Sequence, residues 1–353
     1  MQPSWLRWAA ALVAFIVVAF LGIGVFGDFS GEDAGNTWAL VAAIGLVVAF
    51  AVYAVVEYAQ TGGIASISSQ FDTRTIVLMP IAIAINIILG AAVANALKIP
   101  IYLDSIGTIL VGALAGPIPG ALTGFLANIL WQYVIPPPFQ GAVAAPFAIV
   151  AAVIGLIAGL LGRAGWLRPR PDRTFAQLAV GGIAAFGLVG LMALYAYSRF
   201  YGGGFEFFNP ENTDPIFVIL GWLVLLIFVL FVVGFFALLF VRRDLTVAYV
   251  VVGGILTGIV AALISAPISA NLFSGVTGSG TDFLVAAFRQ GGSDVAAATF
   301  QQGLLSDPVD KLVTFFVVYL ILNAMARRTK ARFPQGERLL ADEAEAPPQE
   351  AYA

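Results

Sequence analysis

The sequence contains neither cysteine nor histidine. Without thiols there is no disulfide, no thiolate nucleophile and no Cys-based metal site. Without imidazoles there is no His-based metal site and no histidine general base. Because no other nucleophile or metal-ligand constellation stands out in the chain, we expect no enzymatic activity and no cofactor.

Charge is scarce as well. Only 10% of the residues are charged and 60% are hydrophobic, and the mean hydropathy is +0.96. Too few polar residues are present to cover the surface of a soluble protein of 353 residues. The basic residues lie at the ends of apolar runs and form no stripe, so no nucleic-acid partner is expected. This composition predicts an all-α integral membrane protein in a lipid bilayer.

Hydropathy predicts about ten transmembrane segments, given that a straight helical span needs about 20 apolar residues. They are 5–26, 38–58, 75–97, 105–116, 119–134, 142–162, 177–200, 215–241, 246–271 and 311–326. Two of them, 105–116 and 119–134, are short and are separated by the Gly- and Pro-rich stretch 116–120. The first segment is too long for a signal peptide and lacks a cleavage-like site, so a retained helix is expected.

The basic residues predict the orientation. With these segments alternating across the membrane, Arg7 and the basic clusters at 163–173, 242–243 and 327–332 all fall on one face. The positive-inside rule makes that face cytoplasmic. We therefore expect a multi-pass protein of the cell membrane with both termini in the cytoplasm and with residues 272–310 outside.

The external segment contains the Gly-rich stretch 275–280. It lacks the Lys-Ser/Thr pair that completes a phosphate-binding P-loop, and no complete G-x-x-x-x-G-K-[ST] occurs in the chain. The sequence therefore predicts no ATPase activity of its own, and the role of this loop is expected on the outer face.

A few polar residues interrupt the apolar segments. Asn86 lies in the middle of the third segment, where a hydrogen bond to another helix is the favoured interpretation. Asp104 precedes Ser105, so a helix cap and a pocket-lining role are both open. Asn128 and Gln132 share one helix face beside aromatic neighbours, a combination that suits a planar, hydrogen-bonding ligand. For the aromatic Trp131 alone, an interfacial belt position is the alternative.

Two further patterns favour structural roles. Asp307, Asp310 and Lys311 precede the last segment, and with Pro308 they predict a helix N-terminus complemented by acids. Gly254 and Gly258 recur at four-residue spacing, which permits close helix approach within the chain or with a partner.

Three stretches together resemble a known family. They are IPIYLDSIGTILVGALAGPIPGALTGFLANIL (99–130), ISAPISANLFSGVTGSGTDFLVAAF (264–288) and GLLSDPVDKLVTFFVVYLIL (303–322). In this order they are similar to the substrate-binding S components of energy-coupling factor (ECF) transporters. The resemblance implies that six of the segments form an S-component-like bundle: 75–97, 105–116, 119–134, 142–162, 246–271 and 311–326.

The same resemblance divides the chain. Residues 1–65 would be a two-helix N-terminal extension, and 70–330 the S-component-like domain with a two-helix insertion at about 177–241. Residues 331–353, acidic and rich in Pro and Ala, are expected to be a disordered cytoplasmic tail.

The resemblance also implies a function. The chain would capture a vitamin, a vitamin precursor or another small micronutrient on the extracellular side, under the loops 98–104, 135–141 and 272–310. A transmembrane coupling subunit and cytoplasmic ATPase subunits would then complete an importer. The substrate-binding candidates are Asp104, Asn128, Trp131, Gln132, Tyr133, Asn271, Thr277, Ser279 and Asp282, and the partner-docking candidates are Ala82, Ala84, Gly254 and Gly258.

Two other classes of function stay open. A self-contained secondary transporter would need buried ionisable residues and inverted repeats, of which the sequence displays little. A membrane sensor or scaffold would need an output domain, and only the short tail is available. The amides, aromatic residues and few charges among the candidates suit a neutral or weakly charged aromatic or heterocyclic ligand.

Overall fold

The computed structural model describes residues 5–26, 34–97, 100–171, 173–200, 233–241 and 243–340, together with residues 226 and 230. These residues form helices and connecting loops and contain no strand. Six helices in the described part are long and apolar enough to cross a membrane. They contain Trp5–Gly22, Thr37–Thr61, Thr73–Val93, Ala145–Arg163, Phe175–Tyr195 and Thr246–Phe273. The chain is therefore an all-α membrane protein, and the described residues do not confirm the predicted count of about ten spans.

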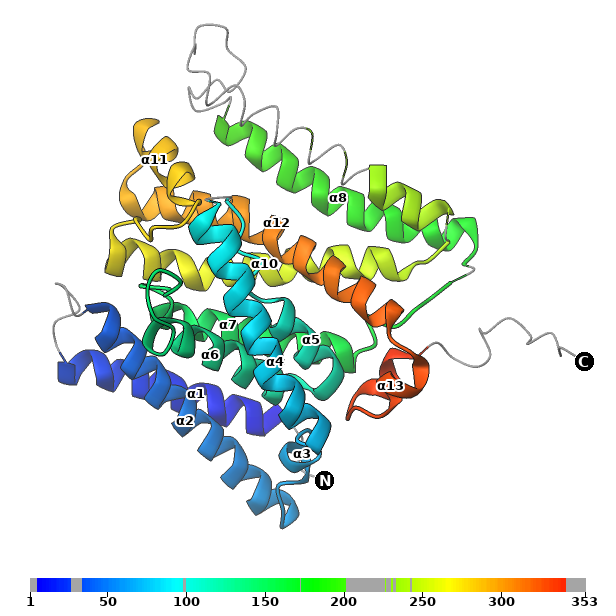
Figure 1. Ribbon diagram of the computed structural model, residues 1–353, viewed down its shortest axis with the longest axis horizontal. Helices are drawn as coiled ribbons and strands as arrows, with labels where there is room; N and C mark the ends of the chain where they lie inside the picture. Colours follow the sequence, from blue (N-terminus) through cyan, green and yellow to red (C-terminus); the bar gives the residue numbers. More distant parts are fainter. Residues whose placement is uncertain are drawn as a thin grey trace, which may run out of the picture.

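The two N-terminal helices pack against each other and against the rest of the chain. Helices α1 (Trp5–Phe26) and α2 (Ala34–Thr61) lie antiparallel (Figure 1). The ion pair between Arg7 and Glu57, at 3.1 Å, joins the start of α1 to the end of α2. Ala42 of α2 belongs to the main hydrophobic core, so the pair is docked on the bundle.

The central bundle contains the elements that surround the cavity described below. They are α4 (Thr73–Gly90) with the π-helix η1 (Ala91–Ala96), α5 (Ile106–Ala115), α6 (Pro117–Tyr133), the 3-10 turn η2 (Ala145–Phe147) with α7 (Ala148–Arg163), α10 (Thr246–Phe273), α11 (Asp282–Gln290) and α12 (Val295–Ala324). Every residue of α5 is buried. At 10 residues this helix is about 15 Å long, half the bilayer core, so it is a core element of the bundle.

The remaining elements lie at the side and at one end. Helix α8 (Phe175–Phe200) runs beside α10, and α3 (Ala65–Ser68) connects α2 to α4 (Figure 1). Most of the predicted segment 215–241 lies outside the described residues. Its described part includes the π-helix η3 (Ala237–Val241). The chain then closes with α13 (Arg327–Ala331) and η4 (Gly336–Leu339).

Small residues let the short helices approach one another closely. A Cβ added to Gly155 of α7 would lie 2.1 Å from the Gly120 carbonyl oxygen of α6. A Cβ on Gly124 of α6 would lie 2.3 Å from the Ala151 oxygen. These distances are well inside van der Waals contact, so only glycine permits this backbone-to-backbone packing.

The course of α12 differs from the sequence prediction. Asp294 caps the helix by accepting a hydrogen bond from the Ala297 N–H at 2.7 Å. Asp307, Asp310 and Lys311 therefore lie in the middle of a 30-residue helix and not at an N-terminus, and Pro308 lies inside it. The prediction failed because the first half of α12 is polar, and its polar side chains are satisfied inside the protein.

The tail prediction is corrected in part. Gln335 donates its backbone N–H to the Leu114 oxygen at 2.9 Å and its side-chain amide to the Gly112 oxygen at 3.1 Å. Leu339 is buried in the main core. The first residues of the expected disordered tail are thus folded against α5, while 341–353 lie outside the described residues.

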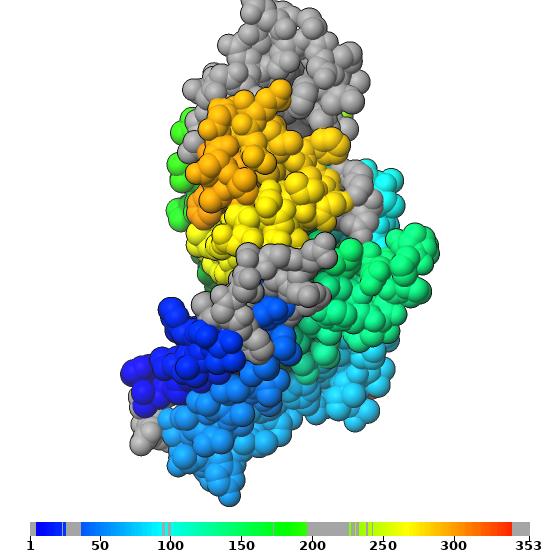
Figure 2. Space-filling model, turned by 90° about the vertical axis from the view of Figure 1, so that its left-hand side faces the viewer, coloured from blue at the N-terminus to red at the C-terminus, as the bar shows by residue number. Residues whose placement is uncertain are grey.

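The basic segments gather at one end of the bundle. Arg338 donates to the Arg163 oxygen at 2.8 Å, and Arg74 donates to the Arg332 oxygen at 3.4 Å. The start of α4 and the ends of α7 and α12 therefore meet there, beside α13 (Figure 1). The opposite end carries α11 and the loop after α6, and Figure 2 looks onto it.

Candidate functional site

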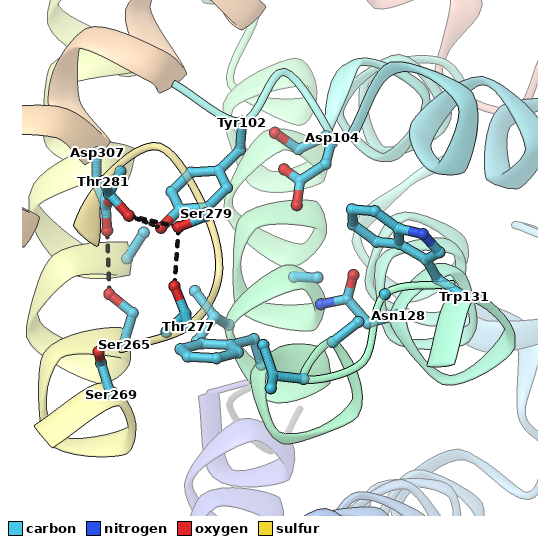
Figure 3. Close-up of a pocket in the computed structure, with 18 of the residues that line it drawn as sticks. Tyr102, Asp104, Asn128, Trp131, Ser265, Ser269, Thr277, Ser279, Thr281 and Asp307 are labelled. Carbon is cyan, nitrogen blue, oxygen red and sulfur yellow. Dashed lines mark hydrogen bonds between the residues drawn. The ribbon is translucent and has the colours of Figure 1, made fainter. Parts of the chain in front are cut away.

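A cavity of about 240 Å³ lies at the end of the bundle opposite the basic segments. Its wall comes from α6, α7, α10 and α12 and from three loops: the one before α5, the one between α6 and η2, and the one between α10 and α11 (Figure 3). These loops are far apart in the sequence. The fold therefore brings several separate segments together around one cavity, and this cavity is large enough for a small molecule.

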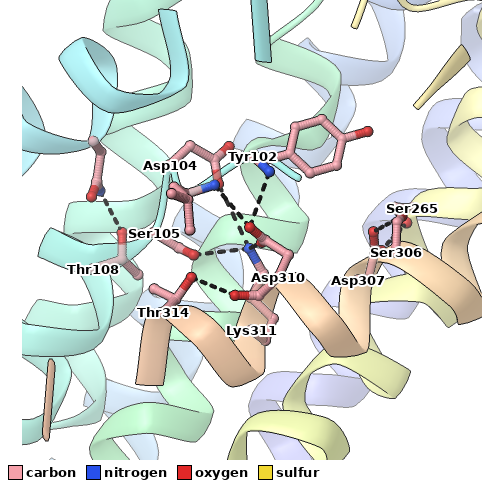
Figure 4. Close-up of polar contacts among 12 residues, drawn as sticks. Tyr102, Asp104, Ser105, Thr108, Ser265, Ser306, Asp307, Asp310, Lys311 and Thr314 are labelled. Carbon is pink, nitrogen blue, oxygen red and sulfur yellow. Dashed lines mark hydrogen bonds and ion pairs between the residues drawn. The ribbon is translucent and has the colours of Figure 1, made fainter. Parts of the chain in front are cut away.

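A charged cluster anchors the loop before α5 to α12. Asp310 accepts the backbone N–H groups of Tyr102 and Leu103 at 3.0 and 2.8 Å (Figure 4). Leu103 has a left-handed backbone with φ of 53°, a conformation that these two hydrogen bonds hold in place. Lys311 donates to Asp310 and, at 2.8 Å, to the Ser105 hydroxyl. The buried charges of α12 thus position one rim of the cavity.

Asp104 extends the cluster into the cavity. One of its carboxylate oxygens lies 3.6 Å from the Lys311 Nζ. Burial raises the pKa of Asp104 above its usual range, and Lys311 opposes this shift. Of the two roles left open by the sequence, the structure favours lining, because Asp104 lines the cavity while the N-cap position of α5 is occupied by Ser105.

A chain of hydroxyl groups joins two of the loops. The Tyr102 hydroxyl is hydrogen-bonded to Thr281 at 2.8 Å, Thr281 to Ser279 at 2.7 Å, and Ser279 to Thr277 at 2.8 Å. Burial, followed by the nearby charge of Asp307, raises the pKa of Tyr102 above its usual range. The phenol therefore stays neutral and hydrogen-bonding at physiological pH.

The Gly-rich loop is ordered by Asp282. The carboxylate accepts the backbone N–H groups of Thr277 at 3.0 Å and Gly278 at 2.7 Å. Gly275 and Gly278 have φ of 80° and 78°, conformations that favour glycine. The loop thus uses its glycines and its one carboxylate to build its own turn beside the cavity.

The third loop is held by the end of α6. The Trp131 indole donates to the Phe139 oxygen at 2.8 Å, and the Gln132 side chain accepts the Ala145 N–H at 2.6 Å. Gly90 and Gly141 leave room for the indole, since a Cβ on either would lie within 2.7 Å of the ring. The ring is fixed at the cavity wall by this packing.

The predicted binding residues divide into two groups. Those that line the cavity are Asp104, Asn128, Trp131, Thr277, Ser279 and Asp282. Gln132, Tyr133 and Asn271 do not line it. Gln132 instead fastens the third loop, Tyr133 is exposed, and Asn271 donates to the Pro267 oxygen of its own helix at 2.9 Å. Asn128 and Gln132 share one face of α6, but only Asn128 reaches the cavity.

Three of the four docking candidates are used inside the chain. Ala82 is fully buried, and its carbonyl oxygen would lie 2.2 Å from a Cβ on Gly107 of α5. Gly254 and Gly258 of α10 press on the α12 backbone near Leu312 and Pro308. Only Ala84 is exposed. The small residues of α4 and α10 therefore serve packing within the chain, which corrects the prediction for Ala82, Gly254 and Gly258.

Sequence reasoning missed the contribution of α10 and α12. Both helices place polar side chains on the cavity wall: Ser265, Ser269, Gln302, Asp307 and Lys311. The available signal was the group of charges around residues 307–311, which the sequence assigned to a helix terminus. Within the described residues, no group of acidic side chains is arranged to hold a metal ion.

Comparisons of the chain with protein-family models, curated proteins and solved structures give no match. The geometry of the cavity and the residues around it are therefore the basis for a functional proposal.

Proposed function

We propose that this chain is the substrate-capture subunit of an ECF-type importer, with no catalytic activity of its own. It binds a vitamin, a vitamin precursor or another small micronutrient in the cavity on the extracellular side. The single observation that carries the proposal is the convergence of three sequence-distant loops on one cavity. A site of this kind can enclose a small molecule on several sides.

The distribution of charge supports the extracellular position of the cavity. The basic segments lie at the opposite end of the bundle, and the positive-inside rule assigns that end to the cytoplasm. A coupling subunit and ATPase subunits would supply the energy, because the chain carries no complete P-loop motif.

A second candidate, a self-contained secondary transporter, rests on a different observation. Asp310 and Lys311 form an ion pair in which both side chains are buried inside the helical bundle. Buried ionisable pairs occur in ion-coupled transporters. Uptake by the chain alone in vesicles with an ion gradient would favour this candidate, whereas uptake that requires ATPase subunits would favour the importer.

The experiment that tests capture is thermal unfolding of the detergent-purified chain against vitamins, precursors, nucleobases and nucleosides. A ligand that binds only the folded state stabilises the protein by about 2.7 kcal/mol when its concentration is 100 times its Kd. We expect at least one compound to raise the midpoint, and we expect Asn128→Ala to abolish the shift.

Asn271→Ala is the matched control, because the same chemical change is made on an exposed residue outside the cavity. Equal loss of binding in both variants, or the absence of any stabilising compound, would contradict capture in this cavity.

A further inference from the structure

Negative charge exceeds positive charge around the cavity. Asp104 and Asp307 line it, Asp310 lies directly behind, and the only cation of the described chain at its wall is Lys311. Lys311 is already bonded to Asp310 and Ser105 and lies 3.6 Å from Asp104. One ammonium group therefore faces several carboxylates.

Asp307 forms no ion pair of its own among the described residues, and the charge acting on it from Lys311, one helical turn along α12, is already shared with Asp310 and Asp104. Its relative exposure is 7%, and it accepts hydrogen bonds from the hydroxyls of Ser265 at 3.0 Å and Ser306 at 3.2 Å. No Lys or Arg of the described residues lies within ion-pair distance of it. Two hydroxyls compensate only part of the cost of burying a carboxylate. Asp282, the other acid at the wall, is bonded to its own loop.

Two neutral polar side chains on the wall have no hydrogen-bond partner among the described residues. Asn128 of α6 and Ser269 of α10 are each 7% exposed and line the cavity, and in Figure 3 Asn128 points toward its centre. No hydrogen bond from either side chain to the described residues is present. Buried polar groups are nearly always hydrogen-bonded in folded proteins. An amide and a hydroxyl directed into a cavity are therefore placed to meet polar atoms of a ligand.

Another part of the wall is apolar and aromatic. Trp131 and Phe147 line the cavity together with Val150 and Ile154 of α7. Such a wall suits a ring, and aromatic side chains also attract cations. The cavity thus offers carboxylates, one amide and aromatic surface to the same bound molecule.

We propose that the captured ligand is a small organic cation with a planar ring, whose positive group pairs with Asp307 and whose polar ring atoms meet Asn128. This inference rests on the proposed capture function and sharpens it. It replaces the neutral or weakly charged ligand expected from the sequence, because the carboxylate of Asp307 comes to the cavity wall only in the folded chain.

For the test, the whole chain is purified in detergent, immobilised on a resin and incubated with the small-molecule fraction of yeast extract. Retained compounds are eluted and identified by mass spectrometry, with Asn128→Ala as a parallel sample. We expect an organic cation that is retained by the wild type, lost in Asn128→Ala and reduced at least tenfold in Asp307→Asn.

The outcomes separate the two proposals. A neutral or anionic compound that depends on Asn128 would overturn the cationic class and leave capture standing. The absence of any compound that depends on Asn128 would overturn both.

A second measurement needs no variant. Benzamidine, benzamide and benzoate share a ring and differ in charge, so each is added at the same concentration to the wild-type chain during thermal unfolding. We expect the largest rise in midpoint with benzamidine. If benzamidine raises the midpoint no more than benzamide or benzoate, the cationic class is overturned.

Discussion

Single polar residues inside this bundle act by joining helices. Asn86 of α4 donates to the Thr108 hydroxyl at 2.8 Å and accepts the Gly107 N–H at 2.7 Å. The interhelical hydrogen bond expected from the sequence is confirmed, and it has a second component. Gly107 lies in the first turn of α5, where the backbone N–H groups have no partner within the helix. Asn86 therefore caps α5 from a neighbouring helix.

Replacing Asn86 tests its role as a cap of α5. Asn86→Leu should lower the free energy of unfolding by about 1–3 kcal/mol, because the Gly107 N–H would stay buried without a partner. The measurement is thermal or denaturant unfolding in detergent. Ile88→Ala, on the exposed face of the same helix, is the control and should change little. Equal effects of the two substitutions would contradict the capping role.

The charged pair of α12 makes a stronger prediction. Lys311→Met leaves Asp310, which is fully buried, without its ammonium partner. We expect a loss of about 3–5 kcal/mol in the free energy of unfolding. Asp310→Asn combined with Lys311→Met should recover much of the loss, because the Asn amide oxygen still accepts the Tyr102 and Leu103 N–H groups. A double variant no more stable than the single one would argue against an uncompensated charge as the cause.

Pairs of helices depend on glycine contacts. Gly258 of α10 faces Pro308 of α12 so closely that a Cβ would lie 2.3 Å from the Pro308 Cα. The same two helices carry Ser265, Ser269 and Asp307 at the cavity wall. The spacing between α10 and α12 therefore affects both stability and the shape of the site.

Gly258→Ala should separate α10 from α12 and cost about 1–3 kcal/mol of stability through overpacking. Gly187→Ala in α8 is the control, since nothing lies within 4 Å of the added methyl group. Helix propensity alone predicts that this control is neutral or slightly stabilising. Unfolding midpoints of the two variants measure the difference, and a harmless Gly258→Ala would show that the helices tolerate a wider spacing.

The whole molecule has one basic end and one end that holds the cavity. Arg74, Arg163, Arg332 and Arg338 contribute to the basic end through the hydrogen bonds described above. If the positive-inside rule holds, this end faces the cytoplasm and the cavity faces outward.

The absence of native cysteine makes the orientation easy to test. Gln290→Cys at the end of α11 and Thr329→Cys in α13 both replace exposed residues at opposite ends. A membrane-impermeant maleimide should label the Gln290 variant on intact cells and the Thr329 variant only after lysis. External labelling of the Thr329 variant would reverse the proposed orientation.

Much of the architecture is predictable from residue types alone. Hydropathy and the lack of charge determine an all-α membrane protein, because each apolar residue favours lipid or protein interior whatever its neighbours are. The positions of basic residues suffice to predict that they share one face. Within the site, Asp104, Asn128 and Trp131 are found at the cavity as expected from their chemistry.

Only the tertiary structure decides which polar residues are inside. Hydropathy treats each side chain separately, so it assigned the polar half of α12 to an external loop and the buried α5 to a membrane span. Burial of Asp310 is possible because Lys311 and the backbone of a loop some 200 residues away satisfy it, and hydropathy contains no information about such partners. The same long-range packing creates the cavity, its excess of carboxylates and an amide that has no hydrogen-bond partner among the described residues.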